Sequence, residues 1–349
     1  MTIAVHRKIQ YLIIVGLMIL LLIYTTDQFS GVPHNNDSAG LVENRQWVSA
    51  TREKLQATSP EVVVIGNSMT GYGFDEVLFS ELSNTPTISI WRKGTASAWF
   101  YLALKNLVLA ESQPRNLVII FRDNILTRPD LRVWGMFKKD IDALAQVDSR
   151  LLDELAYLNH KSAEYYFTNY LPLYAERSLW SDKIKFVAEE FVSQRILNIE
   201  VSELMVSLNN LFTYNGIKYR EMGNQSYYQS TRLDPDDLRF SENVKDSFLP
   251  HIVDLCKQHG INLVVVRFQR LVDLERLRDT ELVEQYIADL ADYAQKHNFV
   301  FIDSTDKNWL DRRHYSVNDH LVEAGKERFT RELFREFQER NMLGQHTGK

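Results

Sequence analysis

The sequence predicts a three-layer α/β fold, in which a parallel β-sheet is covered by helices on both faces. Short apolar runs rich in Val and Ile are typical of buried strands, and they occur at Val62–Ile65, Thr87–Ile90, Leu117–Phe121, Leu263–Phe268 and Phe299–Ile302. Helical stretches separate most of these runs. Strands that alternate with helices pair in parallel and are buried on both sides, so we expect all of them to end at one edge of the sheet.

Predicted helices account for much of the remaining chain. They cover Ala98–Ala110, Lys245–His259, Leu271–His297 and Asp319–Asn341. Gly260 follows the second of these helices, and glycine commonly ends a helix because it adopts the left-handed conformation without strain. Between Thr127 and Ser241 the pattern becomes irregular and aromatic, which predicts a mostly helical insertion or cap. Its aromatic side chains either line an acyl or sugar site or pack the cap on the sheet.

The composition is that of a folded protein. The 349 residues are 45% hydrophobic and 25% charged, which excludes a disordered chain. A net charge of −6 disfavours nucleic acid as a partner. The single cysteine, Cys256, excludes an internal disulfide framework and a cysteine-based zinc finger. The sequence has no motif for a metal or a cofactor, and we expect neither.

An uncharged apolar segment, Ile9–Thr26, lies near the N-terminus and approaches the length of a membrane-spanning helix. Arg7 and Lys8 precede it and acidic residues follow it, so the rest of the chain is expected outside the cytoplasm. A cleaved signal peptide is the alternative, but no small-x-small site follows the segment. We expect an uncleaved single-pass anchor, which in a bacterium lies in the inner membrane and carries a periplasmic domain.

These features divide the chain into five segments. Residues 1–27 are the cytoplasmic stub and the transmembrane anchor, and residues 28–58 are a linker and a lead-in helix. Residues 59–126 and 245–349 are the two parts of the α/β domain. Residues 127–244 are the insertion between them.

Residues suited to acyl transfer follow the predicted strands. Ser68, Gly94 and Asn124 follow the first three strands, and Asp311 and His314 follow the fifth. Ligands of open α/β sheets bind beyond the carboxyl ends of the strands, so these groups are expected to meet. A serine hydroxyl needs an imidazole that takes its proton, and the imidazole needs a carboxylate that fixes its tautomer. Ser68, His314 and Asp311 are therefore the predicted catalytic residues.

The predicted oxyanion hole consists of the Ser68 and Gly94 N–H groups and the Asn124 amide. One such donor typically lowers the barrier by about 3 kcal/mol. Each residue also has a structural explanation: Ser68 as a helix cap, Gly94 as a turn glycine, Asn124 as a loop residue, and Asp311 with His314 as a solvated pair in one turn. Their joint occurrence in strand order favours the catalytic interpretation.

Other polar residues near the strand ends are candidates for substrate binding. They are Asn67, Arg122, Arg267 and Arg270. The arginines would bind an anionic substrate, although pairing with the surplus of acidic side chains explains them equally well. His320 lies six residues after His314, which is a poor spacing for a metal pair, so we expect it at the surface.

The order of these residues resembles the SGNH hydrolase superfamily, the GDSL-like lipases and esterases. Four blocks carry the resemblance: Gly66-Asn67-Ser68, Gly94, Asn124 and Asp311-Arg312-Arg313-His314. Asn67 stands where the superfamily has Asp, and Arg122 and Ile125 stand where it has a glycine and a polar residue. The resemblance covers residues 62–124 and 262–337, and it implies a flavodoxin-like sheet and a Ser-His-Asp triad.

An anchor joined to an SGNH-like domain is similar to proteins that work beside a multi-spanning membrane-bound O-acyltransferase. Those systems acylate envelope or secreted polysaccharides, as in alginate or cellulose acetylation and teichoic-acid D-alanylation. The resemblance implies that Ser68 accepts an acyl group, with acetyl expected, and passes it to a polysaccharide or polyol hydroxyl. His314 would act first as base and then as acid. The alternatives are a carbohydrate esterase on the same triad and a non-catalytic scaffold of a polysaccharide assembly complex.

Overall fold

A five-stranded parallel sheet forms the centre of the molecule. The computed structural model describes residues 36–133, 137–145, 149–158, 233–274, 280–317 and 320–343. The strands are β1 (Val62–Gly66), β2 (Thr87–Trp91), β3 (Asn116–Phe121), β4 (Asn262–Arg267) and β5 (Val300–Asp303). Their order is β2-β1-β3-β4-β5, and every neighbouring pair is parallel. The predicted α/β fold is confirmed, and each predicted strand agrees with the observed one to within one residue.

Side chains of the strands alternate between two hydrophobic cores, one on each face of the sheet. On β1, Val63 and Ile65 pack into the first core and Val62 and Val64 into the second. All four are fully buried. This explains why the strands are continuous apolar runs, because a strand covered on both faces has no solvent side.

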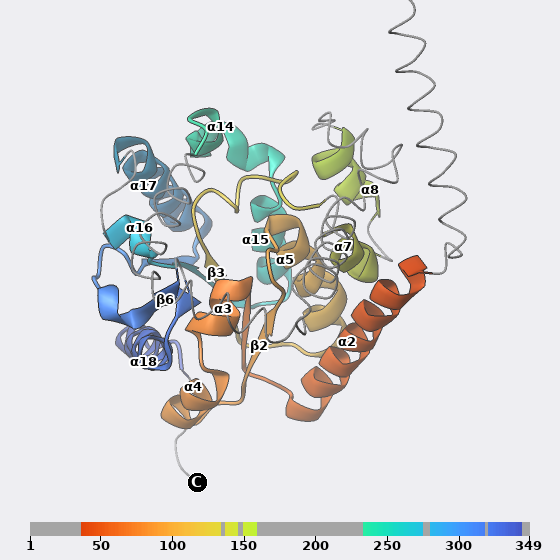
Figure 1. Cartoon of the computed structure of the whole chain (residues 1–349), viewed down its shortest axis with the longest axis horizontal. Helices are drawn as coiled ribbons and strands as arrows, with labels where there is room; N and C mark the ends of the chain where they lie inside the picture. Colours follow the sequence, from red (N-terminus) through yellow and green to blue (C-terminus); the bar gives the residue numbers. More distant parts are fainter. Residues whose placement is uncertain are drawn as a thin grey trace, which may run out of the picture.

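Helices cover both faces, as Figure 1 shows. The first core packs against α2 (Asn36–Thr58), α5 (Ser97–Ala103), α7 (Lys138–Leu144), α15 (Leu249–Gln258) and α17 (Thr280–His297). The second packs against α3 (Ser68–Gly73), α4 (Glu76–Ser83), α16 (Leu271–Leu274) and α18 (Glu323–Glu339). Shorter helical elements are α6 (Leu109–Glu111), α8 (Ser149–Leu152), α14 (Phe240–Asn243), two π-helical turns at Leu104–Val108 and Asp153–Leu158, and 3-10 turns at Asp236–Leu238, Val244–Asp246 and Arg312–His314.

The four predicted helices differ in detail from the observed elements. Ala98–Ala110 contains a π-helical turn between α5 and α6, and the helix predicted from Lys245 begins at Leu249 as α15, after a 3-10 turn. The stretch predicted as one helix over Leu271–His297 contains α16 and α17 as separate helices. The helix predicted from Asp319 begins only at Glu323, because β6 (Tyr315–Val317) and β7 (His320–Leu321) form an antiparallel hairpin in front of it. The hairpin is closed at its base by the Val322 N–H, which donates to the His314 carbonyl over 2.9 Å.

The described parts of the predicted insertion pack on the first core. Val133, Ile141, Leu238 and Phe240 are buried there together with residues of the sheet. Residues 159–232, which include most of the insertion, lie outside the described residues, as does the predicted anchor. Among the described residues, no helix combines the length and the apolar character needed to cross a membrane.

Replacing Ile119 by alanine tests the role of the central strand. Ile119 is fully buried in the middle of β3, so Ile119→Ala should lower the free energy of unfolding by about 2–5 kcal/mol through lost burial and a cavity. Urea denaturation of the purified chain measures this. The matched control is Val77→Ala on α4, where the side chain is 62% exposed and the change should stay within about 0.5 kcal/mol. Equal losses in the two variants would contradict the assignment of the core.

Candidate active site

The candidate site lies where neighbouring strands of the sheet continue in opposite directions. β1 and β3 are adjacent, but β1 leads to β2 on one side and β3 leads to β4 on the other. Such a switch point opens a crevice at the carboxyl edge of a parallel sheet. Ser68 begins α3 directly after β1, and Asn124 lies three residues beyond the end of β3. The topology therefore brings both predicted residues to this edge of the sheet.

Asn67 fixes the start of α3 and so the position of Ser68. It is buried, and its Oδ1 accepts a hydrogen bond from the Met69 N–H over 3.0 Å, which caps the helix. Its Nδ2 donates to the Thr95 carbonyl over 3.5 Å. Asn67 thus joins the loop after β1 to the loop after β2. Asn67, which the sequence suggested for substrate binding, is thus buried and positions the loops of the site in this structure. Ser68 itself is partly exposed and accessible.

The imidazole beside Ser68 belongs to His320. The His320 Nε2 lies 3.3 Å from the Ser68 Oγ, within hydrogen-bond distance. His320 opens β7, and the hairpin β6–β7 carries it against α3. The Tyr72 ring, one turn along α3 from Ser68, lies 4.5 Å from the imidazole between ring centroids. His320 is partly buried, which corrects the expectation of a surface role.

Asp311 and His314, the predicted partners of Ser68, form a local turn instead. The Asp311 N–H donates to the His314 Nδ1 over 3.0 Å, and the Asp311 side chain accepts from the Arg313 N–H over 3.1 Å. The two interactions make a capping box around the 3-10 turn Arg312–His314. The Asp311 Oδ1 also lies 3.1 Å from the His314 Nδ1. Because the His314 Nδ1 accepts the Asp311 N–H, it carries no proton that it could donate to the Asp311 carboxylate, and the backbone hydrogen bond is the interaction that holds the turn.

The structure therefore does not join His314 to Ser68 by a hydrogen bond, and it places His320 there. The spacing in the sequence favoured His314, because Asp311 precedes it by three residues, and it gave no reason to choose His320. Hairpin β6–β7 distinguishes them. Its strands are only three and two residues long, too short for a clear alternating pattern in the sequence.

Two of the predicted oxyanion donors have free N–H groups. Within the described part of the chain, neither the Ser68 N–H nor the Gly94 N–H donates a hydrogen bond. Gly94 has a φ of +72°, and a Cβ at this position would lie 2.5 Å from the Phe137 ring, so no other residue fits this loop without strain. The buried Asn124 differs, because its Nδ2 donates to the Asp237 carbonyl over 3.3 Å. Its oxyanion role stays a prediction.

Arg267 and Arg270 are held in a buried ion-pair network at the ends of β3, β4 and β5. They are only 7% and 2% exposed. The Arg270 Nη1 lies 2.9 Å from Asp123, the Arg267 Nη1 lies 2.9 Å from Asp303, and Asp273 lies between the two arginines. Burial raises the pKa of Asp273, and the guanidinium groups of Arg270 and Arg267 offset part of the rise. Of the two explanations of these arginines, the structure contains the ion pairing.

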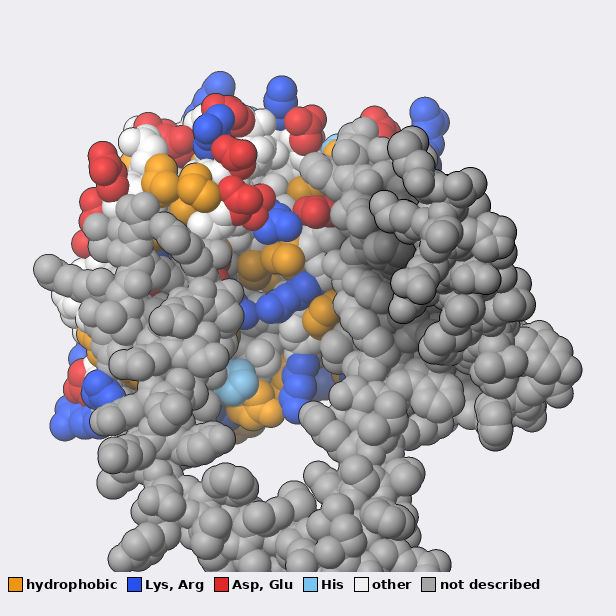
Figure 2. Space-filling model, turned by 45° about the horizontal axis from the view of Figure 1, so that its top comes forward, with side chains coloured by type: hydrophobic (Ala, Val, Ile, Leu, Met, Phe, Trp, Pro, Cys, Tyr) orange, Lys and Arg blue, Asp and Glu red, His pale blue; other side chains and the backbone are white. Residues whose placement is uncertain are grey.

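Basic side chains also gather near the surface. Figure 2 shows Lys and Arg side chains in a hollow on one face, next to hydrophobic and histidine side chains, with Asp and Glu along its upper rim. Arg122 is less enclosed than Arg267 and Arg270, with a side chain 17% exposed and its Nε 3.9 Å from Asp123.

No group of three or more His, Cys, Asp or Glu side chains within the described ranges is placed to hold a metal ion.

Comparisons with known proteins give weak structural similarities. No protein-family model matches the chain, and no curated protein matches its sequence. A GDSL-like lipase from Bacteroides thetaiotaomicron is similar at a TM-score of 0.42 and 10% identity, over 86% of this chain and 99% of the lipase. A proposed acylhydrolase from Bacteroides fragilis is similar at a TM-score of 0.41 and 13% identity, over 83% of this chain and 94% of the acylhydrolase. A proposed lipolytic protein of the G-D-S-L family from Desulfitobacterium hafniense is similar at a TM-score of 0.36 and 12% identity, over 78% of this chain and 97% of the lipolytic protein. At this level the chain is not assigned to a family.

Removal of Arg270 should destabilise the protein in a pH-dependent way. Arg270→Met removes the 2.9 Å pairing of Asp123 with Arg270 and one of the two guanidinium groups beside the buried Asp273, so the free energy of unfolding should fall by about 3–5 kcal/mol at neutral pH. The variant raises the pKa of Asp273 further above its ordinary 3.8. An acid whose folded pKa is raised binds its proton more tightly in the folded state. Its contribution to stability therefore falls as the pH rises from the pKa of the unfolded chain to the raised pKa of the folded state.

The loss should therefore be larger at pH 7 than at pH 4.5 in urea titrations of the variant and the wild type. The control is Arg239→Met, whose side chain is 56% exposed and pairs with Asp236 and Glu242. This surface pair should contribute less than about 1 kcal/mol at either pH. A loss for Arg270→Met that does not depend on pH would contradict the proposed role of the arginine.

Proposed function

We propose that this protein is a serine-dependent acyl-transfer enzyme in which Ser68 is the nucleophile and His320 is the general base. One observation carries the proposal: the Ser68 Oγ and the His320 Nε2 lie 3.3 Å apart at the switch point of the sheet. An alcohol becomes a competent nucleophile when an adjacent imidazole accepts its proton. The partial exposure of Ser68 leaves the hydroxyl open to a substrate.

The reaction proceeds in two steps, and in each the imidazole first accepts a proton and then donates it. In the first, the Ser68 hydroxyl proton moves to the His320 Nε2 while the Oγ attacks the acyl carbonyl, and the imidazolium then protonates the leaving group. The free N–H groups of Ser68 and Gly94 are the donors proposed for the oxyanion of the tetrahedral intermediate. In the second step, His320 takes a proton from the acceptor hydroxyl as its oxygen attacks the acyl-serine, and the imidazolium returns the proton to the Ser68 Oγ when the bond between the Oγ and the acyl carbon breaks.

Tyr72 supports the imidazole in this arrangement. Its ring packs 4.5 Å from that of His320 at an interplanar angle of 42°, which limits the orientations open to the imidazole. The electron-rich face of an aromatic ring also favours a nearby cation, so Tyr72 stabilises the imidazolium of the first step. Asp311, which the sequence predicted for this task, has a half-exposed side chain that accepts from the Arg313 N–H.

The acyl acceptor in this proposal is a hydroxyl group of a cell-envelope or secreted polysaccharide, and acetyl is the acyl group. A multi-spanning membrane-bound O-acyltransferase supplies the acyl group, and the apolar segment at residues 9–26 holds the chain beside it with the catalytic domain outside the cytoplasm. The resemblance of the sequence blocks to SGNH enzymes supports this assignment. The combination of an apolar segment with SGNH-like blocks, which is similar to proteins of polysaccharide O-acylation systems, supports the acceptor and the donor. The placement of Ser68, Gly94 and Asn124 after β1, β2 and β3 supports only the acyl-transfer site itself.

Labelling with a serine-reactive fluorophosphonate tests the assignment of the nucleophile and the base. Wild-type protein should form one adduct, on Ser68, and Ser68→Ala should abolish it. His320→Ala should slow labelling by roughly 10²–10⁴-fold because the base is lost. His314→Ala is the matched control and should label at nearly the wild-type rate. A result with the two histidine variants exchanged would restore His314 as the base, and labelling unaffected by either would contradict the proposal.

Product analysis separates transfer from hydrolysis. With p-nitrophenyl acetate as donor and cellohexaose as acceptor, the proposal predicts acetylated oligosaccharide by mass spectrometry, and Ser68→Ala should reduce its formation by several orders of magnitude. Release of acetate alone, dependent on Ser68, would identify an esterase. If cells that carry Ser68→Ala still acetylate their polysaccharide at the wild-type level, the result would identify the protein as a non-catalytic scaffold.

A further inference from the structure

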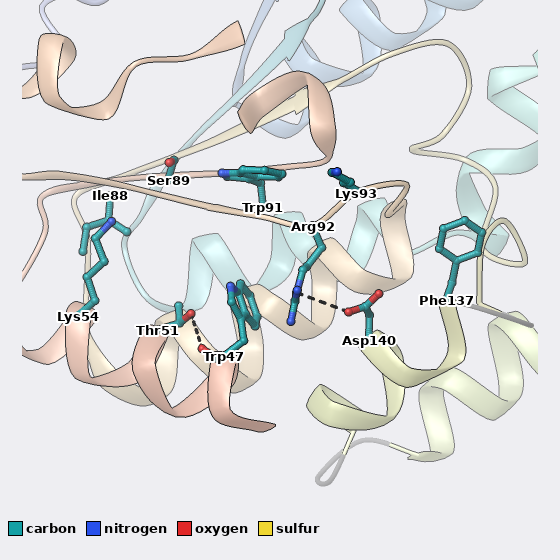
Figure 3. Close-up of a pocket in the computed structure, with 10 residues that line it drawn as sticks. All are labelled: Trp47, Thr51, Lys54, Ile88, Ser89, Trp91, Arg92, Lys93, Phe137 and Asp140. Atoms are coloured by element: carbon teal, nitrogen blue, oxygen red, sulfur yellow. Dashed lines mark hydrogen bonds and ion pairs between the residues drawn. The ribbon is translucent and has the colours of Figure 1, made fainter. Parts of the chain in front are cut away.

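A pocket of about 480 Å³ lies beside the outer edge of the sheet, between α2, the end of β2 and the start of α7. Figure 3 shows its lining, which combines two indole rings with charged side chains. The residues are Trp47, Thr51, Lys54, Ile88, Ser89, Trp91, Arg92, Lys93, Phe137 and Asp140. Its volume falls within the range of roughly 300–1,000 Å³ that is usual for small-molecule sites.

The pocket is connected to the candidate active site through Trp91. Trp91 ends β2 in register with Gly66 of β1, two residues before Ser68, and paired strands lie about 4.8 Å apart. The Tyr72 ring lies 5.9 Å from the Trp91 ring and 4.5 Å from the His320 ring. His320, Tyr72 and Trp91 thus form an aromatic strip that leads from Ser68 to the pocket.

The shape of Trp91 suits it to hold a flat apolar ligand. Helix α3 packs directly on the indole at Gly71, where a Cβ would lie 2.4–2.5 Å from three ring atoms. In Figure 3 the indole is seen edge-on across the top of the pocket, above Trp47 and Thr51. One face of the ring is therefore covered by α3, and the other is turned toward the pocket.

Polar groups surround this apolar surface. Arg92 is held in place over the Trp47 ring at 4.4 Å, with Asn44 and Asp140 as partners at 2.9 and 3.5 Å. The Lys54 ammonium pairs with Glu76 over 2.6 Å, and Lys93 is exposed at the end of the pocket nearest Gly94. Hydrogen-bond donors and acceptors thus lie around an aromatic face, which is a poor match for an acyl chain.

We propose that this pocket binds a pyranose ring of the acceptor glycan and directs one of its hydroxyl groups toward Ser68. A pyranose has apolar C–H faces and a rim of hydroxyl groups, so it matches one indole face surrounded by ammonium, guanidinium and carboxylate groups. The inference rests on the proposed function for its orientation toward Ser68. Binding itself does not require the acyl-transfer step.

Calorimetry on the full chain in detergent tests the pocket in a Ser68→Ala background, where no acyl transfer occurs. The probes are cellohexaose, which is neutral, and mannuronic acid hexamer, which is anionic. Trp91→Ala should weaken binding of the preferred probe by roughly tenfold or more, equivalent to about 1.4 kcal/mol. Trp91→Phe keeps an aromatic face and should retain most of the affinity.

Lys93→Gln is a second variant at an exposed position, and its matched control is Lys245→Gln, whose side chain is 74% exposed beside Asp246. Preference for the hexuronate, with binding weakened by Lys93→Gln but not by the control Lys245→Gln, would assign an acidic glycan. Preference for cellohexaose would assign a neutral one. Unchanged affinity in both Trp91→Ala and Lys93→Gln, or no binding of either probe, would overturn the inference. Fluorophosphonate labelling of the wild type reports separately on the proposed function.

Discussion

The contact between the Ser68 hydroxyl and the His320 imidazole is the interaction on which the arrangement of the site depends. It joins residues 252 positions apart in the chain. The first comes from the turn after a central strand and the second from a two-residue strand near the C-terminus. The sheet order places β1 at the switch point, and hairpin β6–β7 carries the imidazole to α3. Neither element alone creates a nucleophile, because an unassisted serine hydroxyl is a weak one.

The loops around this contact are held by buried polar interactions. Asn67 joins the β1 and β2 loops through its cap and its hydrogen bond to Thr95. Asp123, with a φ of +52°, is fixed by Arg270 next to Asn124. A buried ion pair contributes little net stability but strongly penalises the loss of one partner. Such a network fixes the geometry of the loops at the edge of the candidate active site.

Much of the fold could be predicted from the sequence, because buried parallel strands are continuous apolar runs and Ser68 directly follows one of them. The base could not. Asp311 and His314 have the spacing of a catalytic pair, but the same spacing forms a capping box, in which both side chains satisfy neighbouring backbone groups. His320 depends on a hairpin too short to predict. For Arg267 and Arg270 the sequence leaves two explanations open, contact with an anionic substrate or an ion pair with acidic side chains. It does not show which carboxylates the fold brings near them.

A crystal structure of the phosphonylated protein tests the central claim most directly, because the adduct mimics the tetrahedral intermediate on Ser68. The account predicts the His320 Nε2 within hydrogen-bond distance of the Ser68 Oγ or the leaving-group position. It also predicts one phosphonyl oxygen facing the Ser68 and Gly94 N–H groups, with Asp311 and His314 still in their capping box. An adduct in which His314 contacts the phosphonate, with His320 turned away, would contradict it.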